Sequence, residues 1–336
     1  MLDLNSRIME EKKLEQTYAI ELKNITKRFG KIVANDGINL QVKRGEILSL
    51  LGENGSGKTT LMNMISGIYF PDEGHIFVDG KEVSIRSPKD SFNLGIGMIH
   101  QHFKLIDVMT AAENIILGLK GSAVLDMKKV HKDIQELVDK YGFDLDPAQK
   151  VYTMSVSQKQ TVEIVKMLYR GANILILDEP TAVLTPQEVD KLFDVLRNMR
   201  DDGRAIIIIT HKLNEVLELS DRVSILRKGK YIGTLQTSEA TVESLTEMMV
   251  GEKISLDINR PMPHDLKKRL TIDTITCTNE DGLHILENVS FEAFGGEVLG
   301  VAGIRKWTKR IIRGDCRTYE AFFRKCCFPL AGRRGY

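Results

Sequence analysis

The residues best suited to chemistry form one glycine-rich run. Residues 52–59 read GENGSGKT and fit the pattern GxxxxGK[ST]. In this pattern, glycines let backbone N–H groups surround phosphate oxygens, the lysine reaches the terminal phosphates, and the next hydroxyl can bind Mg²⁺. A turn with an incidental lysine is the alternative, and it is disfavoured because an apolar strand precedes the run and a helical pattern follows it. The predicted phosphate site comprises Gly52, Glu53, Asn54, Gly55, Ser56, Gly57, Lys58, Thr59 and Thr60.

Four further polar residues could complete a site for phosphate transfer. Asp178 and Glu179 follow the apolar run ILIL, where one acid can hold Mg²⁺ and the other can take a proton from an attacking water. Gln101 follows GIGMIH, and His211 follows AIIIIT. Taken singly, such an acid pair is more often a solvated strand end or a helix cap, and a lone histidine is usually structural. As a set, they predict Glu179, His211 and Gln101 as catalytic residues and Thr59, Gln101 and Asp178 as metal ligands.

These residues need a sheet that holds them at one edge. Continuous apolar runs at 47–51, 174–177 and 205–210 predict buried parallel strands, because strands covered on both faces lose the alternating pattern. Helical spacing follows the glycine-rich run, and TPQE at 185–188 has the form of a capping box that starts another helix. Strands that alternate with helices predict an α/β fold with a parallel sheet.

Residues 88–170 are mostly helical in pattern, and the charged segment 126–140 reads as a solvated helix. Within this region, MSVSQKQ at 154–160 opens a helix directly before the strand that leads to the acid pair. Ser155 or Ser157 would serve as the N-cap of that helix.

The order and spacing of these motifs resemble those of ABC-type ATPases over about residues 19–250. The resemblance rests on the glycine-rich run, Gln101, the serine-rich helix start, ILILDEP and His211. It implies a P-loop NTPase of ABC type with a helical subdomain, which uses ATP and Mg²⁺. It also places Phe29 against the adenine and implies a signature that acts on ATP held by another domain. That signature comprises Ser155, Val156, Ser157 and Gln158.

The resemblance narrows to tandem two-domain ATPases that energise importers of simple sugars and nucleosides. GMIHQHFKLIDVMTAAENI and LDEPTAVLTPQE look closest to the nucleoside-uptake branch. Ser157 stands where the wider family has the second glycine of the signature, and Thr185 stands where it has an aspartate. The resemblance implies membrane permease subunits and an extracellular solute-binding lipoprotein as partners, with the ATPase peripheral to the cytoplasmic face of the membrane. The alternatives are a soluble non-transport ABC ATPase and a fragment that binds ATP without transport.

An internal repeat divides the chain. GEVLGVAG at 296–303 parallels GEILSLLG at 45–52, so a strand that begins a second parallel sheet and leaves an open apolar edge is expected at 296–303. Because a second signature would lie beyond this point, two chains could pair to complete a site. The expected organisation is an N-terminal extension at 1–18, an ATPase domain at 19–254 with its helical subdomain at about 88–170, a linker at 255–270, and the start of a truncated second domain at 271–304.

Residues 305–336 differ from the rest in composition. They hold ten Lys and Arg against two acids, three of the four Cys and the only Trp. Codons can be chosen for residues 305–317 that, read one base later, give GNGQKELLEAIA, which looks like the continuation of the family's second domain. We therefore expect an aberrant, frameshifted tail; a genuine basic tail that binds acidic lipid or RNA is the alternative.

The composition of the whole chain excludes other classes. Lys and Arg number 47 against 46 Asp and Glu, so no overall basic field points to nucleic-acid binding. No apolar run approaches the length of a membrane span, and the mixed-charge start lacks the apolar core of a signal peptide. Four cysteines without a CxxC pair favour a reducing compartment.

Overall fold

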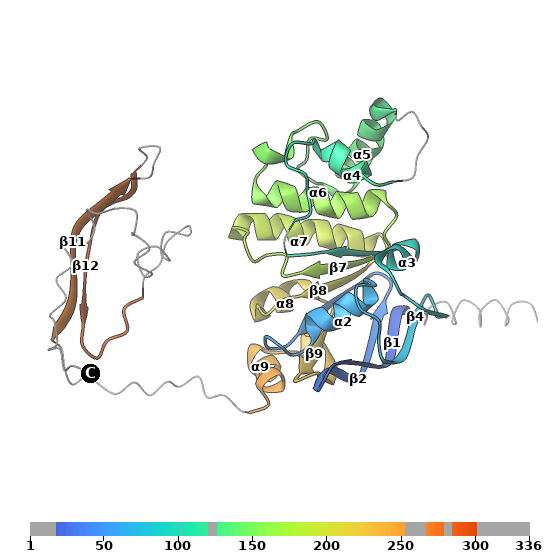
Figure 1. The fold of residues 1–336 in the computed structure, drawn as a ribbon, viewed down its shortest axis with the longest axis horizontal. Helices are drawn as coiled ribbons and strands as arrows, with labels where there is room; N and C mark the ends of the chain where they lie inside the picture. The colour runs from blue at the N-terminus through green and yellow to red at the C-terminus, as the bar shows by residue number, and fades with distance from the viewer. Residues whose placement is uncertain (1–17, 102, 120–125, 253–266, 279–283, 301–336) are drawn as a thin grey trace, which may run out of the picture. The chain divides into compact units, whose positions relative to one another are not determined.

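The computed structural model describes residues 18–101, 103–119, 126–252, 267–278 and 284–300 (Figure 1). The chain divides into two compact units, with the division after Ile254, and each unit is described by itself. The predicted tail at 305–336 and all but one residue of the predicted extension at 1–18 lie outside the described residues. No helix in the described part combines the length and the apolar character that crossing a membrane requires.

A six-stranded sheet forms the centre of the first unit, in the order β10-β9-β3-β8-β7-β6. Its strands are β3 (Glu46–Leu51), β6 (Ile96–Ile99), β7 (Ile174–Asp178), β8 (Ala205–Ile209), β9 (Arg222–Arg227) and β10 (Lys230–Gln236). Neighbouring strands are parallel except for β9 and β10. β3 and β8 are buried along their whole length, as continuous apolar runs require. The three buried strands predicted from the sequence are confirmed.

A four-stranded antiparallel sheet belongs to the same unit, in the order β2-β1-β4-β5. Its strands are β1 (Tyr18–Phe29), β2 (Ile32–Lys43), β4 (Glu73–Val78) and β5 (Lys81–Val83). Leu22 and Leu40 of this sheet share one hydrophobic core with Leu61 and Ile65, which lie on the first helix after the glycine-rich run. The antiparallel sheet therefore packs on the element that follows the predicted phosphate site.

Helices lie around these sheets, and α4, α5 and α6 gather at the end away from β1 and β2 (Figure 1). The helices are α2 (Lys58–Ile65), α3 (Pro88–Asn93), α4 (Ala111–Ile116), α5 (Met127–Tyr141), α6 (Val156–Tyr169), α7 (Pro186–Asp201), α8 (Leu213–Leu219) and α9 (Val242–Val250), with short 3₁₀ turns η1 (Val151–Thr153) and η2 (Thr237–Glu239). The helices α4, α5 and α6 share a hydrophobic core of their own, which makes them a distinct helical part.

Helix starts follow the sequence signals closely. Thr185 caps α7 in a capping box with Glu188, as TPQE predicts, and Pro186 occupies the first helical turn. Ser155, rather than Ser157, is the N-cap of α6, and it forms a second capping box with Gln158. Both helix starts are therefore fixed by local side-chain bonds to the backbone.

Two expectations for residues 88–170 are corrected. This segment includes β6, which pairs with β7 in the six-stranded sheet, so a boundary at about residue 88 for the helical part is too early. The helix α5 is not solvated all round, because Val130, Ile134 and Val138 form a buried stripe packed with α4 and α6. Charged residues separate the members of this stripe in the sequence, so the apolar spacing was overlooked.

Hydrogen bonds and an ion pair connect the end of α5 to the residues that follow α7. The Tyr141 hydroxyl donates to Oδ2 of Asp202 at 2.6 Å, and Arg204 Nε donates to the Tyr141 oxygen at 3.0 Å. Lys140 Nζ lies 2.8 Å from Oδ1 of Asp202. The bond from Lys140, followed by that from Tyr141, holds the pKa of Asp202 below its ordinary value.

The second unit contains one described hairpin, β11 (Lys268–Thr278) and β12 (His284–Phe294). Strand β11 includes the last three residues of the predicted linker at 255–270. Four register shifts in β1–β2 recur in β11–β12, each displaced by 250 residues along the first strand. Equivalent side-chain bonds recur as well: Thr26 Oγ1 accepts from the Gly37 N–H at 3.0 Å, and Thr276 Oγ1 accepts from the Asn288 N–H at 3.1 Å. The hairpin therefore repeats β1–β2 in structure.

The strand expected at 296–303 is not present in the described part of that segment. Residues 296–300 have no regular secondary structure, and Val298 is 97% exposed. In the first unit, β3 is held by β8 and β9 on its two sides. The described residues of the second unit provide no equivalent neighbours, so an apolar sequence alone does not form the strand.

Candidate functional site

The glycine-rich run forms a tight loop between β3 and α2. Gly57 is the N-cap of α2 and has φ of 97°, a backbone conformation that favours glycine. A Cβ at Gly57 would collide with Ala34 O, and a Cβ at Gly52 would collide with Leu226 O and the Ser56 side chain. The loop therefore keeps its shape only with glycine at these two positions, which leaves backbone N–H groups free to face a ligand at the helix start.

Lys58 crosses back over the loop. Its side chain is largely buried, and Nζ donates to Gly52 O at 2.6 Å and to Glu53 O at 3.0 Å. Burial lowers the pKa of Lys58, and the nearby carboxylates of Glu179 and Asp178 oppose that shift. Phosphate oxygens would offer this ammonium charged acceptors in place of neutral carbonyls.

Asp178 and Glu179 lie at the carboxyl end of β7, two strands away from β3 in the sheet. Burial, followed by the neighbouring charge of Glu179, raises the pKa of Asp178, while Lys58 opposes that shift. A bound cation would remove the cost of holding this carboxylate ionised. The environment of Asp178 is thus suited to a metal ion.

The backbone at Glu179 is strained. Glu179 has φ of 50°, uncommon for a residue with a side chain, and its N–H donates to Ile209 O of β8 at 2.8 Å. Its Oε1 lies 2.8 Å from Nδ1 of His211, whereas Oε2 is buried and has no hydrogen-bond partner. The strained turn therefore aims one carboxylate oxygen at His211 and leaves the other free for a ligand.

One cavity of about 650 Å³ joins most of the predicted residues. Its lining comprises residues 54–60, Gln101, Asp178 and Glu179 together with residues 32–34, Ile209, Lys228 and Gly229. The last group was not predicted. Lys228 and Gly229 form the turn between β9 and β10, and the Gly229 N–H donates to Ser56 O at 3.2 Å. In the sequence, this turn is marked only by a lysine followed by a glycine, and that dipeptide matches no phosphate-binding motif.

Phe29 is at the end of β1 and does not line the cavity itself. It pairs across the hairpin with Ile32, which does line the cavity. The residue is 43% exposed, and its ring lies 5.2 Å from that of Tyr69, measured between centroids. Phe29 is therefore next to the cavity, because its partner on the neighbouring strand is part of the cavity lining.

The predicted signature lies elsewhere. Ser155, Ser157 and Gln158 line a separate cavity of about 350 Å³, together with residues of α7. Val156 is the first residue of α6 and is 44% exposed. Within this chain, the structure does not bring the signature to the phosphate loop.

The donor set of the larger cavity fits Mg·ATP. The carboxylate of Asp178, the amide of Gln101 and the hydroxyl of Thr59 line the same space, and hard oxygen donors of this kind suit Mg²⁺. The Ser56 hydroxyl is buried without a partner beside the loop backbone. The combination of loop, lysine and acid pair defines a P-loop nucleotide-binding protein.

Comparisons with known proteins specify the class. Residues 35–182 match the model of the ABC transporter family. The chain is 45% identical over 287 residues to the nucleoside import ATP-binding protein NupA of Lactococcus lactis and 47% identical over 289 residues to the guanosine import ATP-binding protein NupO of Bacillus subtilis. Each match covers 85% of this chain but only 57% of the relative. Residues 35–182 thus resemble an ABC transporter cassette, and the chain spans little more than half the length of these two relatives.

A solved structure shows the same fold. The structure of cbiO1 from Clostridium perfringens, part of the ABC transporter complex cbiONQ, superposes with a TM-score of 0.61 at 28% identity. The match covers 70% of this chain and 95% of cbiO1. The α/β cassette fold predicted from the sequence is confirmed, with its parallel strands and its helical part, whereas the antiparallel sheet was not predicted.

Proposed function

We propose that the first unit binds Mg·ATP and hydrolyses it to drive import of a nucleoside or a simple sugar. The observation that carries this proposal is the single cavity shared by the phosphate loop, Gln101, Asp178 and Glu179. The import role is supported by the relatives, whose names describe nucleoside and guanosine import. Among these solutes, the two names favour a nucleoside.

Each residue of the cavity has a role that follows from its surroundings. Lys58 would exchange its bonds to Gly52 O and Glu53 O for bonds to the terminal phosphates. Thr59, Gln101 and Asp178 would hold Mg²⁺, which, when bound, neutralises charge on the transferred phosphoryl group. Phe29 would lie against the adenine.

Glu179 is the proposed general base. Its free Oε2 would accept a proton from a water positioned by Gln101, while Oε1 stays with His211. His211 would contact the terminal phosphate through Nε2, the ring nitrogen that does not face Glu179. The buried position of Glu179 Oε2 protects the proton transfer from bulk water.

Assembly extends beyond the first unit. The signature at Ser155, Val156, Ser157 and Gln158 would act on ATP held by another cassette, so two chains could pair. We infer from the repeated hairpin that residues 271–304 begin a second cassette after a linker. The proposed partners are membrane permease subunits and an extracellular solute-binding lipoprotein, with the chain peripheral to the cytoplasmic face of the membrane.

Calorimetric titration of the full chain with Mg·ATP tests the proposed site. Lys58→Ala should weaken binding by roughly 10- to 100-fold, because a charged hydrogen bond to phosphate is lost. Lys132→Ala is the matched control, since that lysine is on α5 with its side chain 77% exposed. Equal affinity in wild type and Lys58→Ala would refute the site, and co-purification with a permease would test the transport role.

A further inference from the structure

An aromatic pair lies at the edge of the candidate nucleotide site. The rings of Phe29 and Tyr69 are 5.2 Å apart between centroids and inclined by 73°, which is the edge-to-face geometry that aromatic pairs prefer. Both residues are partly exposed, Phe29 at 43% and Tyr69 at 38%. No motif in the sequence singles out Tyr69, and it does not line the cavity itself.

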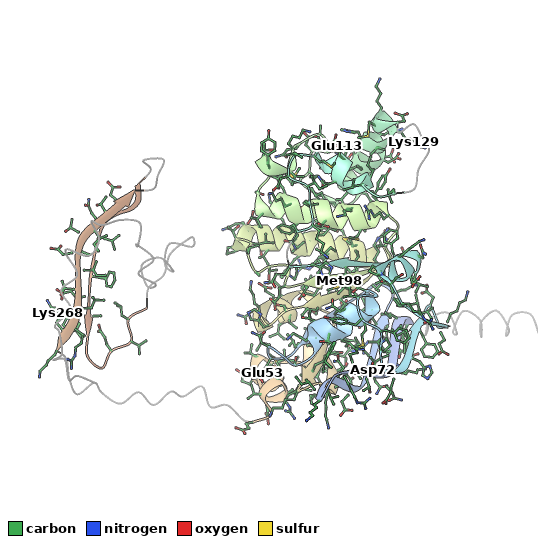
Figure 2. All side chains as sticks on the ribbon, viewed as in Figure 1. Glu53, Asp72, Met98, Glu113, Lys129 and Lys268 are labelled. Atoms are coloured by element: carbon green, nitrogen blue, oxygen red, sulfur yellow. The ribbon has the colours of Figure 1, made fainter. Side chains whose placement is uncertain are left out.

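The segment that carries Tyr69 is fixed to the end of β1. The Tyr69 N–H donates to Asn63 O of α2 at 3.0 Å. Lys27 Nζ donates to Phe70 O at 2.8 Å and to Asp72 Oδ1 at 2.9 Å. Figure 2 labels Asp72 in the region of β1 and β4. Tyr69 is therefore held from the two sides, by the phosphate-loop helix and by β1.

The same contacts act on Phe29. Asp72 Oδ2 also accepts from the Arg28 N–H at 2.6 Å, directly before Phe29. Lys27 Nζ lies 5.6 Å from the centroid of the Phe29 ring. Tyr69 and Lys27 thus lie beside the ring of Phe29, a residue that is only partly exposed.

An apolar path connects this pair to the phosphate loop. Phe29 pairs with Ile32, and Ile32 and Val33 line the cavity while being 70% and 44% exposed. Exposed apolar side chains gathered beside a polar cavity are typical of a ligand site. A flat base attached to a triphosphate would extend along this path from Lys58 to Phe29.

We propose that Tyr69 is a positioning residue that fixes the ring of Phe29 for stacking on the nucleotide base. The inference rests on the proposed function, because it requires that ATP occupy the cavity. Tyr69 contacts Phe29 and would act through it, without touching the phosphates. Its loss frees the Phe29 ring to rotate, so that part of the stacking energy is spent on ordering the ring when ATP binds.

Calorimetry with two probes separates this role from a general structural one. Full chain is titrated with Mg·ATP and with magnesium tripolyphosphate, which carries the phosphates but no base. Tyr69→Ala should weaken ATP binding by about two- to tenfold, in line with the energy of one aromatic pair, and leave tripolyphosphate binding unchanged. Tyr69→Phe should keep wild-type affinity, since Tyr69 contacts Phe29 through its ring, which the phenylalanine variant retains.

Phe70→Ala is the matched control, because Phe70 is a neighbouring exposed aromatic residue whose ring faces Arg86. In a Phe29→Ala background, Tyr69→Ala should have no further effect on ATP binding. If Tyr69→Ala does not fold, Tyr69→Leu replaces it in the titrations, because leucine keeps an apolar side chain but removes the aromatic ring.

Three results would overturn the inference: unchanged ATP affinity in Tyr69→Ala or in Tyr69→Leu, equal weakening for both probes, or a full effect of Tyr69→Ala without Phe29. Failure of the wild-type chain to bind ATP would instead refute the proposed function. The two failures are therefore distinguishable in one set of titrations.

Discussion

Glu179 Oε1 and His211 Nδ1 are 2.8 Å apart, and the second carboxylate oxygen of Glu179 is buried with no partner. The first oxygen orients the carboxylate, and the second is left to act on a ligand. Because a buried acceptor without a partner is costly, the arrangement is favourable only when a donor such as water arrives. We therefore expect the water that takes part in the reaction to donate the missing hydrogen bond to Glu179 Oε2.

The first prediction follows from this free oxygen. Glu179→Gln should bind Mg·ATP with near wild-type affinity and lose hydrolysis by about 10²- to 10⁴-fold, because a carboxamide cannot accept the proton from water. Phosphate release is measured beside ATP binding on the same preparations. Hydrolysis at the wild-type rate in this variant would remove Glu179 from the mechanism.

The second prediction concerns Asp178 and Mg²⁺. Asp178→Asn should reduce the enhancement of ATP binding by Mg²⁺, because the amide offers a neutral ligand in place of a carboxylate. Titration of the variant with ATP, with and without Mg²⁺, gives this enhancement directly. An enhancement equal to that of the wild type would exclude Asp178 as a metal ligand.

The third prediction uses the raised pKa of Asp178. A carboxyl group whose pKa is higher in the folded than in the unfolded state stabilises the fold at low pH, and this contribution is lost as pH rises through the folded pKa. Without nucleotide, Asp178→Asn should therefore melt at a higher temperature than wild type at pH 7. The difference should shrink on acidification toward the ordinary value of 3.8. A lower melting temperature at pH 7 would contradict the burial effect.

The fourth prediction has the opposite sign and concerns Asp202. Lys140 and Tyr141 lower its pKa in the folded state, so its contribution is present above the unfolded pKa and lost as pH falls through the folded value. Asp202→Asn should cost less than about 1 kcal/mol at pH 7, because the pair is partly exposed. Denaturation at pH 7 and at pH near 2 measures the loss of that difference, and a constant difference would show that charge is not its source.

The fifth prediction concerns pairing. Because the signature and the phosphate loop line different cavities of this chain, hydrolysis should depend on association between chains. Specific activity should rise with protein concentration in the dilute range, and Ser155→Ala should reduce it without weakening ATP binding. Full activity of a chain shown to be monomeric by light scattering would contradict the pairing requirement.

The local signals in the sequence predicted much of this structure. The phosphate loop, β3, β7 and β8 were predictable because a glycine pattern and continuous apolar runs directly specify their local geometry. The capping box at Thr185 was equally readable. These features depend on neighbours within a few residues, so one sequence is enough to find them.

Features that depend on distant neighbours were missed. Strand β6 is a run of four apolar residues, which is too short for the spacing of apolar residues to distinguish a strand from a helix. Only its pairing with β7 decides between the two. Lys228 reaches the cavity because β9 lies beside β3, an adjacency that the sequence does not display. Tyr69 contacts Phe29 from a loop held by the ion pair between Lys27 and Asp72. Residues 296–300 show the reverse, since a strand-like sequence stays irregular without partners.

The hairpins β1–β2 and β11–β12 have the same register shifts although their neighbouring strands differ. The pair β1–β2 is extended by β4, whereas β11–β12 forms a two-stranded sheet among the described residues. Both pairs nevertheless slip at the same four places. The same irregularities therefore occur in a pair that a third strand extends and in a pair with no third strand among the described residues. Such a hairpin is a transplantable unit: exchanging residues 18–43 for 268–294 should preserve its internal hydrogen bonding, although the side chains that face the rest of the cassette would change.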